Sequence, residues 1–182
     1  MSGLEEQIAF LKTVGIELNP DVTIDDLLKT GLSDNEPDAY NSLLCVLGDD
    51  DKFSPDVWCF DAECINGSGS YIRIARRFAK LSDGTLPLEN IQDEVYNDGT
   101  DEDSASLFFI MRGKGYRWNL QVNDDWLDSS VFTYFVELHS RQNLPKRFIF
   151  HSMGQEGIIA YATPEELAAL NKQTGLDFAW LT

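Results

Sequence analysis

Five consecutive residues, Asp124-Asp125-Trp126-Leu127-Asp128, combine three carboxylates with one indole. Carboxylates attract a positively charged partner, and tryptophan often anchors protein–protein contacts. The pattern therefore indicates a binding surface for a basic protein, and its candidate residues are Asp124, Asp125, Trp126 and Asp128. A structural interpretation competes with it. In that interpretation Asp125 caps a following helix, Asp128 favours the positive helix N-terminus, and Trp126 packs as a hydrophobic staple.

A second acidic segment covers residues 97–104, which contain no apolar side chain that could anchor them to a core. It supplies three further candidate partner-binding residues, Asp101, Glu102 and Asp103. We expect this segment to form an acidic loop. A solvated loop that only keeps the protein soluble is the alternative interpretation.

Three cysteines and two histidines could in principle supply nucleophilic or metal chemistry. Cys45, Cys59 and Cys64 are odd in number and lack the spacing of a zinc site, and His139 and His151 stand apart in the sequence. The spacing favours reduced, buried thiols in a cytoplasmic protein, and it predicts no metal and no cofactor. A pocket that combines Cys59 or Cys64 with His151 stays open as an enzymatic alternative.

The net charge is the strongest compositional signal. The chain of 182 residues has 31 acidic and 14 basic side chains, a formal charge of −17. Residues 1–140 contain 27 acidic and 10 basic side chains, whereas residues 141–182 contain four of each. Because affinity for phosphates depends on clustered lysine and arginine, the composition argues against nucleic acid and anionic membranes as ligands. No run of eighteen apolar residues predicts a membrane span.

Helical periodicity and capping signals predict the elements that carry these residues. Three short helices are expected within residues 1–48, where leucines recur at helical spacing. Longer helices are expected over about 70–81 and 126–142. Thr163, Pro164 and Glu166 are the N-cap, N1 and N3 residues of a last helix that ends at Gly175.

Alternating apolar residues predict the strands. Residues 107–111 and 116–122 flank a four-residue turn and are typical of a hairpin, and residues 147–151 and 157–161 resemble a second pair. Residues 57–60 favour a shorter strand. Strands grouped between helices indicate an α+β fold with a mostly antiparallel sheet packed by helices. We expect one domain over 1–182, with a helical N-terminal segment (1–48) and a mixed body (57–182).

Residues 70–175 resemble small acidic bacterial immunity-type proteins of polymorphic toxin systems. The resemblance depends on Tyr116-Arg117-Trp118, on residues 124–128, and on Gly154-Gln155 followed by a strand and the stretch 163–167. It implies a protein without enzymatic activity that binds and neutralises a toxin, and it assigns no functional residue.

The expected function is therefore that of an acidic inhibitor of a basic partner, such as a toxin with nuclease activity. Two alternatives stay open. One is a small cytoplasmic enzyme with a pocket of carboxylates, cysteine and histidine. The other is a regulatory or structural protein whose acidity only aids solubility. The sequence predicts no oligomeric state.

Overall fold

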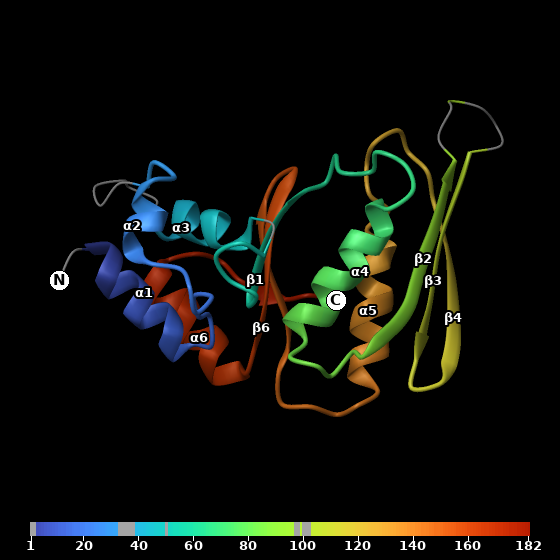
Figure 1. The fold of residues 1–182 in the computed structure, drawn as a ribbon. Coiled ribbons are helices and arrows are strands. Elements are labelled where there is room, and N and C mark those ends of the chain that lie inside the picture. Colours follow the sequence, from blue (N-terminus) through green and yellow to red (C-terminus); the bar gives the residue numbers. More distant parts are fainter. Residues whose placement is uncertain (1–2, 33–38, 50, 97–98, 100–102) are drawn as a thin grey trace. The chain divides into compact units, whose positions relative to one another are not determined.

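The computed structural model describes residues 3–32, 39–49, 51–96, 99 and 103–182. Within these residues the chain forms six helices and seven strands (Figure 1). The strands lie in two sheets, and all four pairs with a described register are antiparallel, which confirms the α+β class and the helical N-terminal segment. Contacts divide the chain into two compact units. Unit 1 is Met1–Phe60 with Leu144–Leu181, and unit 2 is Asp61–Asn143 with Thr182.

Unit 1 packs helices against a four-stranded sheet. Its helices are α1 (Gly3–Thr13), α2 (Ile24–Leu28), α3 (Ala39–Gly48) and α6 (Pro164–Thr174). Its strands, in sheet order, are β1 (Val57–Asp61), β6 (Glu156–Ala162), β5 (Arg147–Met153) and β7 (Ala179–Trp180). Figure 1 shows α1, α3 and α6 on one side of this sheet.

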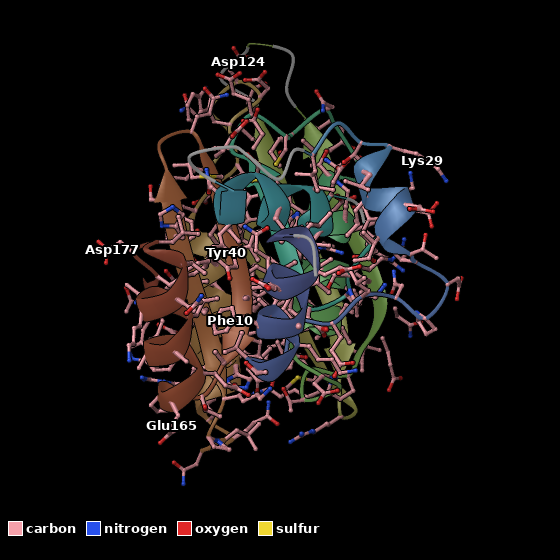
Figure 2. The ribbon with its side chains drawn as sticks, turned by 90° about the vertical axis from the view of Figure 1, so that its left-hand side faces the viewer. Phe10, Lys29, Tyr40, Asp124, Glu165 and Asp177 are labelled. Atoms are coloured by element: carbon pink, nitrogen blue, oxygen red, sulfur yellow. The ribbon has the colours of Figure 1, made fainter. Side chains whose placement is uncertain are left out.

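The core of unit 1 consists of leucines from the helices and branched residues from the sheet. Leu43, Leu44 and Leu47 of α3 are buried, as their helical spacing predicts, and they join Ile149 and Ile158 in one cluster. Phe10 of α1 and Tyr40 of α3 add an edge-to-face ring contact with centroids 6.0 Å apart, at the labelled positions in Figure 2. Burial of this apolar surface is the main stabilising contribution to the unit.

The end of α3 lies unusually close to β1. A Cβ atom at Gly48 would overlap the backbone nitrogen of Cys59 and would lie 2.9 Å from the carbonyl carbon of Trp58. Only glycine therefore allows the helix to reach the strand backbone at this point.

Unit 2 packs two helices against a three-stranded antiparallel sheet. The helices are α4 (Ser70–Leu81) and α5 (Ser130–Ser140), and the sheet order is β2 (Leu88–Tyr96), β3 (Ser104–Met111) and β4 (Lys114–Leu120). Both helices lie on the same face of this sheet in Figure 1. The expected bounds of α4 are confirmed, and the five residues of its predicted apolar face are all buried: Tyr71, Ile74, Ala75, Phe78 and Leu81.

Aromatic rings fill the space between the helices and the sheet of unit 2. Phe135 of α5 stacks on Phe78 of α4 at 4.6 Å and meets Trp118 of β4 edge to face at 4.8 Å. Phe109 of β3 contacts both Phe135 and Trp118. Such ring contacts stabilise the unit beyond the burial of apolar surface, so this cluster holds α4 and α5 against the sheet.

The capping signals predicted for the last helix are confirmed. Thr163 and Glu166 form a capping box at α6, with Pro164 in the first turn and Gly175 as a left-handed C-cap. The shorter helix α2 has an equivalent box made by Thr23 and Asp26, in which the pKa of Asp26 lies well below its ordinary value because the Thr23 hydroxyl donates to it.

Three details differ from the sequence-based expectation. The turn between β3 and β4 has two residues rather than four, because Arg112 and Gly113 both adopt positive φ and close the tight turn that suits twisted strands. The helix expected over 126–142 begins at Ser130 and ends at Ser140. Strand β2 was not expected. Among the described residues, no helix is long and apolar enough to cross a membrane.

Candidate functional site

The segment that joins β4 to α5 contains the predicted partner-binding pattern, and backbone contacts hold it in place. The N–H of Leu127 donates to the carbonyl oxygen of Ala62 at 2.8 Å, and the N–H of Ile65 donates to that of Asp125 at 2.9 Å. Between them, Glu63 and Trp126 form an isolated antiparallel bridge. The segment is therefore fastened to residues 62–65 like a short strand pair.

A tight turn presents the side chains at the tip of this segment. The N–H of Trp126 donates to the carbonyl oxygen of Asn123 at 3.0 Å, and Asp124 between them adopts a φ of +52°. Asp124 is exposed on an outer turn of the chain (Figure 2), Asp125 is half-buried, and the Trp126 residue is 39% exposed. Because backbone hydrogen bonds already hold the turn that carries this indole, a partner that binds it does not have to order the turn.

Asp128, by contrast, holds the fold together. Its Oδ2 accepts the N–H of Gln121 at 2.7 Å and its Oδ1 accepts the N–H of Ser130 at 2.9 Å. Its own N–H donates to the hydroxyl of Tyr71 at 3.0 Å. Burial is the largest influence on that hydroxyl and raises the pKa of Tyr71. Asp128 therefore joins the end of β4, the start of α5 and helix α4, and we assign it a structural role.

The prediction that Asp125 caps α5 is wrong. The residue before the helix is Ser129, which makes no side-chain capping bond, and the first-turn N–H of Ser130 is satisfied by Asp128 instead. The backbone of Asp125 is used in the pairing with Ile65, five residues before α5 begins at Ser130. Another part of the same structural interpretation, that Asp128 favours the helix start, agrees with its bond to Ser130.

Two further carboxylates come from the end of β1 and from the stretch that follows it. Asp61 and Glu63 are both exposed, and Oδ1 of Asp61 accepts the N–H of Glu63 at 2.9 Å. We call Asp61, Glu63, Asp124, Asp125 and Trp126 the acidic turn. The sequence shows Asp61 and Glu63 only as a separate acidic pair, because nothing local links them to a turn sixty residues later.

Two carboxylates of the acidic turn influence the pKa of Cys64. Burial is the largest influence on this half-buried thiol and raises its pKa, and the charges of Asp61 and Asp125 raise it further. Arg73 of α4 lowers it and donates from Nη2 to the Cys64 carbonyl oxygen at 3.3 Å. The two carboxylates thus act on the same thiol, although they lie far apart in sequence.

The other predicted site residues belong to the loop between β2 and β3. Asp101 and Glu102 lie outside the described residues. Asp103 is half-buried and directly precedes β3, whose residue Ala105 pairs with Leu120 at the end of β4. Because antiparallel neighbours run in opposite directions, the start of β3 and the segment after β4 share one end of the sheet. The topology therefore brings Asp103 to the same sheet end as the acidic turn.

Another acidic pair, Asp93 and Glu94, serves structural contacts. The Asp93 carboxylate accepts N–H groups at the N-terminus of α4, at 2.7–3.2 Å. Glu94 forms an exposed ion pair with Arg117 at 3.2 Å. The positive end of α4 is therefore occupied by a carboxylate of the chain itself.

The enzymatic alternative combines His151 with Cys59 or Cys64. His151 packs on the ring of Phe178 at 5.3 Å in unit 1, and Cys59 of the same unit donates its thiol to Cys45. Cys64 belongs to unit 2. A groove of about 520 Å³ between residues 19–30 and Lys52-Phe53, and another of about 350 Å³ beside Arg117, are lined by neither cysteine nor histidine. Over the described part of the chain, no group of three or more His, Cys, Asp and Glu side chains could hold a metal ion.

No protein-family model, no curated protein and no solved structure matches this chain.

Proposed function

We propose that the protein is a cytoplasmic binding protein that neutralises a basic protein partner, in the manner of an immunity or inhibitor protein for a toxin such as a nuclease. The observation that carries the proposal is Trp126. Its indole is exposed, its backbone is fixed by the bridge to Glu63, and carboxylates flank it on both strands. Aromatic anchors inside a charged rim are typical of the residues that dominate binding free energy.

The physical mechanism combines attraction with occlusion. The net charge of −17 steers a basic partner toward the protein and raises its association rate. The acidic turn then meets the basic groove with which a nuclease would bind phosphates, and Trp126 excludes water from the centre of the contact. Neutralisation needs no chemical step, since the bound protein covers the partner's active groove.

The revised set of contact residues follows from the geometry. Asp124, Asp125 and Trp126 stay in the proposed surface. Glu63 is added because it bridges to Trp126, and Asp61 is added because its carboxylate accepts the N–H of Glu63. Asp128 is removed because both of its carboxylate oxygens accept backbone N–H groups. Asp103 is a secondary candidate at the same sheet end.

A charge-reversal experiment tests the proposal. The experiment first searches the genes beside this one for a toxin domain, and then assays that protein for nuclease activity and for its dissociation constant. We expect Asp124→Lys with Asp125→Lys to weaken inhibition by about 100-fold or more, since close charge pairs couple by several kcal/mol. Glu137→Lys with Asp177→Lys is the matched control, because both side chains are exposed and the net charge changes equally.

The two variants separate a specific surface from general acidity. Equal weakening by both would show that only net charge matters, and it would remove the acidic turn from the proposal. Full inhibition by the Asp124/Asp125 variant would contradict the proposal directly.

A further inference from the structure

Two cysteines in unit 1 lie in direct contact. The Sγ atoms of Cys45 on α3 and Cys59 on β1 are 2.7 Å apart, with the Cys59 thiol donating to Cys45, and neither is in a disulfide. Two carbon atoms in contact lie about 3.5–4.0 Å apart, and a disulfide bond measures about 2.05 Å. The separation of these larger sulfur atoms is thus closer to a bond than to an ordinary packing contact.

The fold holds the two thiols together independently of their chemistry. Cys45 precedes Gly48 by three residues, so both lie on the same face of α3. Gly48 lies against the backbone of Trp58 and Cys59, where a Cβ atom could not fit. The close approach that needs glycine at position 48 is therefore the approach that brings Cys45 to Cys59.

We propose that Cys45 and Cys59 form a reversible thiol–disulfide pair that a low-molecular-weight disulfide oxidises. The site covalently links the end of α3 to β1. It lies in unit 1, whereas the acidic turn lies in unit 2, so this inference does not depend on the proposed function.

The hydrogen bond assigns different roles to the two sulfur atoms. Donation from the Cys59 thiol lowers the pKa of Cys45, and the same bond, together with burial, raises the pKa of Cys59. Burial and, to a smaller extent, the negative charge of Glu156 oppose the first effect. Because the thiolate is the attacking form, Cys45 is the first nucleophile and Cys59 closes the bond.

The reaction is balanced as two exchange steps. The Cys45 thiolate attacks one sulfur of glutathione disulfide, which forms a mixed disulfide and releases one glutathione thiolate. Cys59 loses its proton to that thiolate and attacks Cys45 Sγ, which breaks the mixed disulfide and releases the second glutathione. The protein loses two protons and two electrons, and one glutathione disulfide becomes two glutathione thiols.

Cys64 is a comparison thiol within the same chain. It is also half-buried and free, but it lies in unit 2, and burial raises its pKa. A reagent that attacked cysteines only by their exposure would therefore treat all three similarly. If the free thiols of Cys45 and Cys59 disappear together while that of Cys64 remains, the two cysteines react as a pair and not merely because they are accessible.

The experiment exposes the reduced full chain to glutathione disulfide, traps remaining thiols by alkylation, and maps them by mass spectrometry of the intact protein and its peptides. We expect Cys45 and Cys59 to disappear together, with a crosslinked peptide and no glutathione retained on either. A disulfide that closes the loop from Cys45 to Cys59 should raise the melting temperature by roughly 6–12 °C, and a reducing dithiol should reverse the change. Cys64→Ser should behave like the parent protein in each measurement.

Two single variants and two possible outcomes for the parent protein test the proposal. In Cys45→Ser and in Cys59→Ser the crosslink and the rise in melting temperature should both vanish. Glutathione should remain attached to Cys45 in Cys59→Ser, because that variant lacks the thiol that closes the bond. The proposal is overturned if the parent protein carries separate glutathione adducts on Cys45 and Cys59. It is also overturned if both thiols stay open to alkylation after Cys64 has reacted.

Discussion

The carboxylate of Asp93 on β2 accepts the backbone N–H of Tyr71 in the first turn of α4, with Oδ2 and the nitrogen 2.9 Å apart. It also accepts the N–H groups of Gly69 and Ile72. One side chain thus satisfies several donors that a helix start leaves without an intrahelical partner, and its charge faces the positive end of the helix.

Removal of this carboxylate should destabilise unit 2. Charge-assisted hydrogen bonds contribute about 1.5–3 kcal/mol, and the donors are part-buried, so we expect Asp93→Ala to lower the free energy of unfolding by about 2–3 kcal/mol. Urea denaturation checks this value. Glu94→Ala is the neighbouring control. It removes only an exposed ion pair with Arg117 and should cost about 0–1 kcal/mol. Similar losses in both variants would contradict the capping role.

Trp126 should matter for binding and little for folding. We expect Trp126→Ala to change the free energy of unfolding by about 0.5 kcal/mol or less, because the residue is 39% exposed and its bridge to Glu63 uses backbone atoms. The same variant should weaken binding to the basic partner by about 2 kcal/mol or more, as anchor residues do. Denaturation and titration calorimetry on one preparation give both values. A large loss of stability would show instead that the indole packs as a staple.

Gly48 should tolerate no side chain. We expect Gly48→Ala to destabilise the protein by about 1–3 kcal/mol, since the new methyl group would overlap the backbone of Cys59. Gly115→Ala is the matched control. There the methyl group would meet the Phe108 ring at 3.6 Å, an ordinary contact, and the cost should be under about 1 kcal/mol. Thermal unfolding of both variants measures the contrast, and equal melting temperatures would contradict the close approach of α3 to β1.

His139 should make stability depend on pH. The residue is 3% exposed, and burial lowers its pKa from the ordinary value of 6.5. Because the folded pKa lies below the unfolded one, the stability that neutral His139 contributes is complete above about pH 6.5 and is lost as the pH falls toward the folded pKa. The loss is at most about 1.4 kcal/mol for each pH unit.

Urea denaturation at about pH 7.5 and about pH 5.5 tests this sign. The parent protein should lose more stability over this interval than His139→Leu, which cannot take up the proton. The comparison uses the change between the two pH values, so a constant cost of the substitution cancels. Parallel losses in the two proteins would show that His139 does not cause the dependence.

Local signals in the sequence were sufficient for several elements. Helix α4 was predicted to the residue because its five apolar positions recur at helical spacing and Ser82-Asp83-Gly84 follows them. Helix α6 was predicted because Thr163, Pro164 and Glu166 are a complete N-terminal signal. Such elements depend on interactions within a few residues, which a sequence displays directly.

Strand β2 lacked a local signal. Its core-facing position at residue 93 is an aspartate whose partners are N–H groups on α4, and a register shift between Glu89 and Gln92 interrupts the pairing with β3. Only Val95 of this strand is buried, so the alternation of apolar and polar residues is missing. A strand whose polar residue satisfies a distant helix cannot be recognised by hydrophobic periodicity.

Only part of the candidate site could be predicted, again because some of its residues are brought together by contacts between distant parts of the sequence. Asp124, Asp125 and Trp126 stand out locally, but their partners Asp61 and Glu63 are brought to them by the pairing of Ile65 with Asp125. Asp128 belongs to the same short motif, and yet its oxygens serve the backbone at Gln121 and Ser130. Composition cannot separate a carboxylate that faces a partner from one that holds a turn.

Unit 1 is assembled from both ends of the chain, with unit 2 between them. Strand β1 neighbours only β6 in its sheet, and β6 begins at Glu156. During synthesis on the ribosome, the helices and strands of unit 2 are complete before β1 can meet its neighbour. The leucines of α1 and α3 therefore cannot be buried against the complete sheet until the last strands have been synthesised. Because of this delay, the first sixty residues are the part of the nascent chain with the longest exposure to chaperones and proteases.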